Sequence, residues 1–60
     1  MSGPLAIILE DDPKQANIFT KTFNVAGFTT ETYHRGDKGL ARLKEVTPEV
    51  LLTDMQMFPN

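Results

Sequence analysis

The sequence predicts an α/β fold in which three parallel strands alternate with two helices, in the order β-α-β-α-β. Two short apolar runs, Leu5–Leu9 and Val50–Thr53, are typical of strands buried on both faces of a parallel sheet. Helically spaced apolar residues occupy much of the chain between them. Because strand-helix-strand crossovers are right-handed, the elements form a single parallel sheet, and residues 1–60 are expected to belong to one domain.

The first strand is expected at Leu5–Leu9 and is followed by a helix with clear start and stop signals. Asp12 is a preferred N-cap residue, and Pro13 suits the first helical position. Gly27 is a natural C-terminal stop. The helix would turn one apolar face to the sheet, made of Ala16, Phe19, Phe23 and Ala26.

The second strand is expected at residues 28–33, where threonines and aromatic residues alternate between two sides. A turn follows at residues 34–36. Asp37 is expected to cap a second helix that continues to about residue 46, before Thr47 and Pro48 end it. Its buried stripe would consist of Leu40, Leu43 and Val46. Val50–Thr53 is then the third strand.

Composition narrows the classes of protein to consider. Sixty residues form a small core, which makes a domain of this size marginal by itself. The net charge of −2 argues against a nucleic-acid-binding surface. The absence of cysteine excludes disulfides and thiolate metal sites and fits a cytoplasmic location. No apolar run approaches the length that spans a bilayer, and residues 1–4 lack the pattern of a signal peptide. Residues 1–4 are interpreted as a tag or a disordered segment.

Acidic residues follow the first and third strands directly, which favours the strand order 2-1-3. This order places the two acid-bearing strands side by side and makes the gap between them the point where ligands bind in open α/β sheets. Glu10, Asp11 and Asp54 would then converge. Oxygen ligands without histidine or cysteine favour Mg²⁺, Mn²⁺ or Ca²⁺. Asp54 stands alone and is the better nucleophile, whereas Glu10 and Asp11 are the better metal ligands.

Residues 8–13 (ILEDDP) and 51–57 (LLTDMQM) resemble the receiver domain of bacterial two-component response regulators. The resemblance covers the whole chain, but only the first half of the family's flavodoxin-like, three-layer fold. It implies that Asp54 is the phosphorylated aspartate. It also implies that Asp11 binds Mg²⁺ directly, that Glu10 acts through water, and that Asp54 and the backbone carbonyl of Gln56 complete the metal site. The same resemblance supports the strand order 2-1-3 by analogy.

The chain departs from the family pattern in two respects. Phe58 separates Met57 from Pro59, where the family's proline usually follows directly. The family's hydroxyl residue after strand four and its lysine after strand five have no counterpart in these sixty residues. The chain is therefore expected to be part of a longer protein, or a fragment that associates through the open edge of its third strand.

The predicted function is that of a phosphoacceptor and not of an enzyme in its own right: a sensor histidine kinase or phosphotransfer protein would phosphorylate Asp54 with the help of Mg²⁺. A homodimer through the exposed sheet edge is a further expectation, with no membrane contact. The alternative is a receiver-like module that is not phosphorylated and only binds proteins or assembles with itself. A hydrolase with a carboxylate nucleophile is disfavoured, because such enzymes usually carry a second aspartate at the position of Gln56.

Simpler interpretations also exist for the same residues. The acidic triplet at residues 10–12 could be only a solvated helix N-terminus, where carboxylates favour the positive end of the helix dipole. Asp12 itself is interpreted as a cap and not as a metal ligand. His34 is interpreted as a surface loop residue in preference to a phosphate relay. Phe19, Phe23 and Phe28 are interpreted as core packing.

Overall fold

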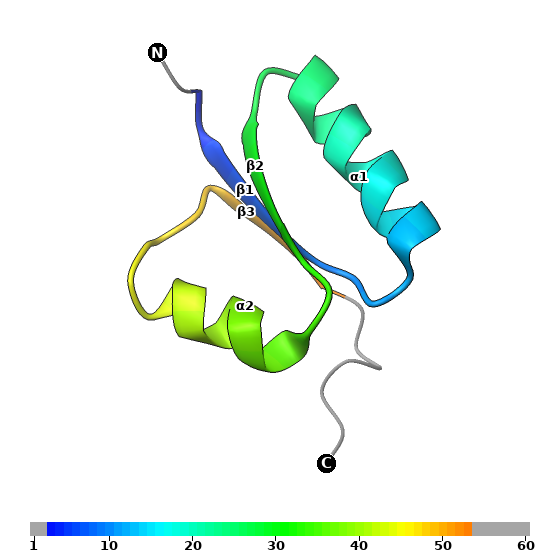
Figure 1. Cartoon of the computed structure of the whole chain (residues 1–60). Helices are drawn as coiled ribbons and strands as arrows, with labels where there is room; N and C mark the ends of the chain where they lie inside the picture. The colour runs from blue at the N-terminus through cyan, green and yellow to red at the C-terminus, as the bar shows by residue number, and fades with distance from the viewer. Residues whose placement is uncertain (1–2, 54–60) are drawn as a thin grey trace.

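The computed structural model describes residues 3–53 and contains all five expected elements in the expected order (Figure 1). Asp54, Gln56 and the loop expected after the third strand lie outside the described residues. The elements are β1 (Leu5–Leu9), α1 (Pro13–Val25), β2 (Thr29–Tyr33), α2 (Gly36–Leu43) and β3 (Val50–Thr53).

The three strands form one parallel sheet in the order β2-β1-β3, which confirms the predicted topology. In the register, Leu9 of β1 lies beside Tyr33 of β2 and Thr53 of β3, so the strands end together. The sheet also extends before β1, because the Pro4 carbonyl accepts a hydrogen bond from the Thr29 amide at 2.8 Å.

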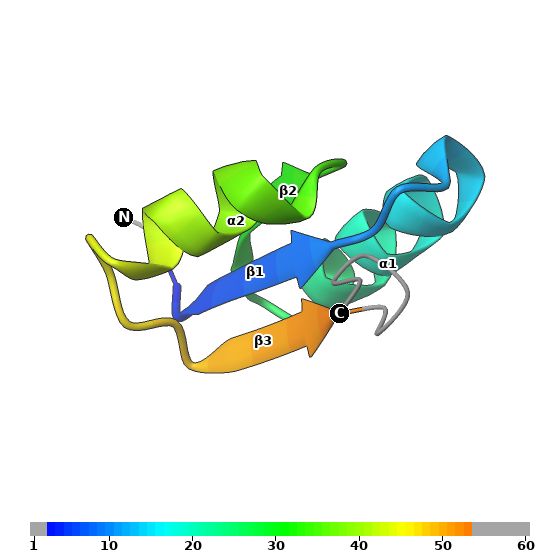
Figure 2. The same cartoon turned by 90° about the horizontal axis from the view of Figure 1, so that it is seen from below.

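The two helices lie on opposite faces of the sheet, as Figure 1 shows. Because successive side chains of a strand point to opposite faces of the sheet, one known contact shows which residues face which helix. Thr32 bonds to Thr20 of α1, so the residues in register with Thr32 face α1. Glu31 bonds to Arg42 of α2, so its register partners Ile7 and Leu51 face α2. Both helices pack mainly on β1 and β2 (Figure 2).

The core is centred on β1, the middle strand, which is buried on both faces. Its residues from Ala6 to Leu9 are at most 1% exposed, and Ala16 of α1 is buried equally well. The continuous apolar run of β1 is therefore explained by its position, as expected for a central parallel strand. Phe19, Phe23 and Phe28 are only half-buried, and the rings of Phe23 and Phe28 meet edge to face with centroids 5.4 Å apart.

Helix α1 ends as predicted, at a glycine in the left-handed region. Gly27 has a φ of +100°, which L-residues rarely adopt. The Phe28 amide returns to the Phe23 carbonyl at 3.0 Å, and the Gly27 amide donates to Asn24. Ala26, expected on the apolar face, is exposed, because the helix already ends at Val25.

Helix α2 is shorter than predicted, and the face that it turns to the sheet is not the one predicted from its leucines. It ends at Leu43 and not at residue 46, and its N-cap position is Arg35, which makes no side-chain capping bond. Asp37 lies in the first turn, where its carboxylate accepts a hydrogen bond from the Lys38 amide at 2.9 Å. Leu40 is 46% exposed, so its assignment to the buried stripe is wrong.

The reason for this difference in the contact face is Gly39. It is the buried residue of α2, and a Cβ atom at this position would collide with the side chain of Leu9. Because Gly39 has no side chain, the backbone of α2 can approach β1 closely at this position. The spacing of the apolar residues carries no signal for such a contact, so it predicted the wrong face of the helix.

Candidate functional site at the carboxyl end of the sheet

The site is formed first by the loop that joins β1 to α1. Glu10 follows β1 directly, and its amide donates to the Tyr33 carbonyl at 3.0 Å, which continues the ladder between β1 and β2. Its carboxylate is almost buried, with the residue 8% exposed, and Oε2 accepts a hydrogen bond from the Asp12 amide at 3.2 Å. Asp11, between them, is exposed. The loop therefore holds one carboxylate against the protein and turns the next one to solvent.

Asp12 ends this loop as the N-cap of α1, as predicted. Its Oδ1 accepts a hydrogen bond from the Lys14 amide at 3.0 Å, and its carbonyl accepts from Ala16 at 2.9 Å. Its backbone is extended, and Pro13 occupies the first helical position without needing a hydrogen-bond partner for its nitrogen. The Asp12 carboxylate therefore serves as the cap of α1.

Glu10 and Asp11 carry negative charges that no described cation neutralises by an ion pair. Within residues 3–53 the ion pairs are formed elsewhere, by Arg35 with Asp37 and by Arg42 with Glu31 and Glu45. Two neighbouring carboxylates in this state fit a hard cation, which prefers oxygen ligands. They do not make a complete site, because residues 3–53 contain no group of three acidic, histidine or cysteine side chains that could hold a metal ion.

Of the four predicted site residues, the structure describes two, Glu10 and Asp11. Glu10 and Asp11 lie at the carboxyl end of β1, and Leu9 and Thr53 are register partners at the ends of β1 and β3. Asp54 and Gln56 lie outside the described residues, so the structure does not report whether they approach the two acids.

His34 belongs to the same edge of the sheet, although the sequence predicted only a position in a surface loop. It is exposed, as predicted, but its Nδ1 lies 3.2 Å from the carbonyl oxygen of Glu10. Because a carbonyl oxygen only accepts, Nδ1 carries the proton in this bond. The signal was available, since His34 follows β2 directly and parallel strands end at one edge.

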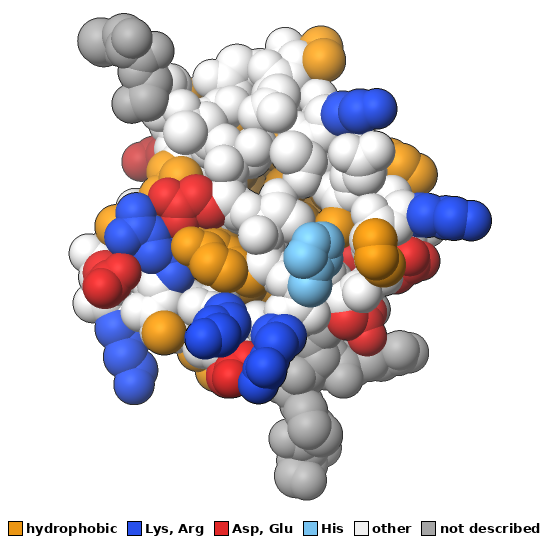
Figure 3. Space-filling view, viewed as in Figure 1, with side chains coloured by type: hydrophobic (Ala, Val, Ile, Leu, Met, Phe, Trp, Pro, Cys, Tyr) orange, Lys and Arg blue, Asp and Glu red, His pale blue; other side chains and the backbone are white. Residues whose placement is uncertain are grey.

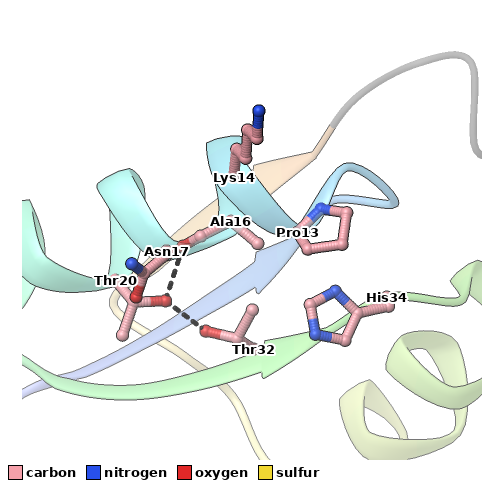
Figure 4. A pocket seen from close by; sticks show the side chains of 7 residues that line it. All are labelled: Pro13, Lys14, Ala16, Asn17, Thr20, Thr32 and His34. Carbon is pink, nitrogen blue, oxygen red and sulfur yellow. Dashed lines mark hydrogen bonds between the residues drawn. The ribbon is translucent and has the colours of Figure 1, made fainter.

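A groove of about 490 Å³ lies beside this loop, between α1 and the end of β2 (Figure 4). Thr20 and Thr32 meet within it, with their hydroxyl oxygens 2.6 Å apart, and Thr20 also bonds to the Ala16 carbonyl at 2.7 Å. A histidine is visible on the same face in the space-filling view (Figure 3). The groove is lined by Pro13, Lys14, Ala16, Asn17, Thr20, Thr32 and His34.

On the opposite face, a polar cluster joins α2 to β2. Arg42 donates to both carboxylate oxygens of Glu31, at 2.8 and 3.0 Å, and the Tyr33 hydroxyl donates to the same carboxylate at 2.9 Å. The hydrogen bond from Arg42 holds the pKa of Glu31 below its usual value. Desolvation, together with the hydrogen bond to Glu31, raises the pKa of Tyr33. These interactions tie α2 to the outer strand β2.

No protein-family model, curated protein or solved structure matches the chain significantly. Among the described residues, no helix has the length and apolar character needed to cross a membrane.

Proposed function

We infer that this chain is the phosphoacceptor part of a receiver domain, in which Asp54 accepts a phosphoryl group with the help of Mg²⁺. One observation carries the proposal: β1 and β3 are neighbouring parallel strands that end in register at Leu9 and Thr53. Each is followed in the sequence by carboxylates, Glu10 and Asp11 after the first and Asp54 after the second. In open parallel sheets this is the edge at which ligands bind.

The proposed reaction is the transfer of a phosphoryl group from a phosphohistidine to an aspartate. A carboxylate oxygen of Asp54 attacks phosphorus and forms the P–O bond of an acyl phosphate. The P–N bond to the donor histidine breaks, and its electron pair stays on the imidazole, which then takes up a proton. The donor is a sensor histidine kinase or a phosphotransfer protein, and the proposed location is the cytoplasm.

The carboxylates of Glu10 and Asp11 would hold Mg²⁺, with Asp54 and the Gln56 carbonyl as the remaining protein ligands. Asp11 is exposed and free to bind directly, whereas one oxygen of Glu10 is engaged with the Asp12 amide, which suits a role through water. The cation would supply charge neutralisation for the phosphoryl oxygens. In this proposal, the described part of the chain supplies two carboxylates that have no ion-pair partner among residues 3–53.

Labelling of the intact protein with acetyl phosphate and Mg²⁺, followed by intact-mass measurement, tests the assignment. Asp54→Asn is expected to abolish labelling, because the amide is a poor nucleophile. Asp11→Asn is expected to abolish it as well, by removing a metal ligand. Glu10→Gln should raise the Mg²⁺ concentration for half-maximal labelling about 10–100-fold, the usual effect of an outer-shell change.

Asp12→Asn is the matched control, because it changes an acid in the same loop while keeping an equally good N-cap. It should label like the wild type. Stoichiometric labelling of Asp54→Asn or Asp11→Asn would refute the proposal. A wild-type protein that shows no saturable response to millimolar Mg²⁺ would instead favour a binding module without phosphate chemistry.

A further inference from the structure

The ladder between β1 and β2 is completed at its carboxyl end by a side chain. In a parallel ladder, the N–H of a residue bonds to one residue of the neighbouring strand, and its C=O bonds to the residue two positions further on. The Glu10 amide follows this pattern and donates to the Tyr33 carbonyl at 3.0 Å. The next donor would be the Arg35 amide, but no backbone amide of residues 3–53 donates to the Glu10 carbonyl. The His34 imidazole takes its place, with Nδ1 3.2 Å from that oxygen.

The backbone donor is missing because the chain leaves the sheet at this point. Strand β2 ends at Tyr33, and Arg35 is already the N-cap residue of α2, where its carbonyl accepts a hydrogen bond from the Gly39 amide at 3.2 Å. Figure 4 shows His34 just beyond the end of β2. Glu10 is only 8% exposed, and a buried carbonyl without a donor is costly. His34 therefore satisfies a backbone group that the turn leaves without an amide.

This hydrogen bond orients the peptide group that joins Glu10 to Asp11. The Glu10 carbonyl and the Asp11 N–H belong to one planar trans unit, so they point in opposite directions. Because His34 follows β2 and binds the carbonyl, the Asp11 N–H points away from that strand. The Cα atom of Asp11 lies in the same plane. The point from which the exposed Asp11 side chain leaves the loop is thus set by His34.

The acidic loop is held at both of its ends. At its start, the backbone of Glu10 is bonded through its N–H to Tyr33 and through its C=O to His34. At its end, the Asp12 amide donates to Oε2 of Glu10 at 3.2 Å, and the Asp12 carboxylate caps α1. Asp11 is the residue between these two anchors. Its orientation therefore depends on the hydrogen bonds of its neighbours.

We propose that His34 is a positioning residue for the cation site. Its Nδ1–H bond to the Glu10 carbonyl holds the peptide between Glu10 and Asp11 in the orientation in which both carboxylates bind one Mg²⁺. This inference rests on the proposed function, because it takes the two acids as metal ligands. His34 acts through the backbone of Glu10 and is not itself a ligand. Outer-shell partners of this kind orient metal ligands and raise the affinity of a site for its metal.

Two substitutions of His34 separate the hydrogen bond from the polarity of the side chain. His34→Asn places an amide N–H close to the position of Nδ1, whereas the longer side chain of His34→Gln places it nearer to that of Nε2. Mg²⁺ titration of the intact protein without a phosphoryl donor, followed by amide chemical shifts, gives the Kd for the metal. His34→Asn should bind like the wild type. His34→Gln should raise the Kd about 10–100-fold, the usual effect of losing an outer-shell partner.

Arg35→Gln is the matched control, because Arg35 lies in the same turn but binds Asp37, at 2.9 and 3.1 Å, and not the acidic loop. It should bind Mg²⁺ like the wild type. A second measurement needs no variant and remains informative if a substitution unfolds the chain. In the metal-free wild type, the nitrogen chemical shifts of the neutral imidazole should show the proton on Nδ1 and a lone pair on Nε2.

The proposal is overturned if folded His34→Gln binds Mg²⁺ like the wild type, since His34 would then only stabilise the turn. Equal losses of affinity in His34→Asn and His34→Gln, a loss in Arg35→Gln, or a neutral imidazole with its proton on Nε2 would overturn it as well. In each of these cases the wild type still binds Mg²⁺, so the proposed function stands. A wild type without a saturable response to Mg²⁺ contradicts the proposed function, and the positioning role with it.

Discussion

At the scale of single residues, three consecutive acids have three different environments. Glu10 is nearly buried and bonded to a backbone amide, Asp11 is exposed, and Asp12 caps a helix. All three side chains are carboxylates, so the sequence alone does not distinguish them. Their positions in the loop give each one a different exposure and a different hydrogen-bond partner. Only the first two are available for the proposed cation site.

Asp12→Ala is expected to lower the free energy of unfolding by about 0.5–2 kcal/mol, because the Lys14 amide loses its acceptor. Asp12→Asn should cost little, since asparagine caps equally well. Urea denaturation followed by circular dichroism measures both. Equal losses for the two variants would show that the charge of Asp12, and not its capping bond, stabilises the helix.

At the scale of elements, α2 contacts the sheet through a glycine. Leucines in α2 set an apolar periodicity, but the side chain that fills the contact comes from β1: Leu9 lies against Gly39. Helix propensity alone would favour alanine at this position by about 1 kcal/mol. The close approach reverses that preference, because Leu9 is 1% exposed and has little room to move.

Gly39→Ala is therefore expected to destabilise the chain by about 1–3 kcal/mol, the usual cost of overpacking. In a Leu9→Ala background the same substitution should be neutral or stabilising, because the colliding side chain is gone. A double-mutant cycle in urea measures the coupling. Additive effects would mean that α2 moves away from β1 at no cost.

At the scale of the whole molecule, a small sheet is held between two helices, and a polar cluster adds to the apolar contacts. Arg42 of α2 binds Glu31 of β2 through two hydrogen bonds. This pair is partly exposed, with side-chain exposures of 33% and 27%, so solvent screens it. Its effect should nevertheless be visible in the pH dependence of stability, because the pKa of Glu31 is lowered.

The folded chain binds a proton at Glu31 less readily than the unfolded chain. The stabilisation is therefore fully present above the ordinary glutamate pKa of about 4.3, and it is lost as the pH falls through the lowered value of the folded state. The free energy of unfolding of the wild type should fall more steeply below about pH 5 than that of Glu31→Gln.

Glu45→Gln is the control for this pH series, because Glu45 accepts a single bond from Arg42 and its side chain is 67% exposed. Its slope should stay close to that of the wild type. Thermal or urea unfolding between pH 7 and pH 3 gives the slopes. Identical slopes for Glu31→Gln and the wild type would show that Arg42 binds the carboxylate equally well in the unfolded chain.

The sequence by itself determined the order of elements, the parallel sheet and the start and end of α1. These follow from local chemistry: apolar runs define strands, Asp12 and Pro13 start a helix, and Gly27 ends it. The acids that follow β1 were likewise found from their position after a buried run. Such signals act within a few residues, so no tertiary contact is needed to recognise them.

Only the tertiary structure decided which face of α2 packs on the sheet, and that His34, Glu31 and Arg42 have partners far away in the chain. Gly39 approaches β1 because it lacks a side chain, which an apolar pattern cannot register. The partners of His34 and Arg42 depend on which strands and helices become neighbours. Contacts of this kind are set by packing, and packing depends on the whole fold.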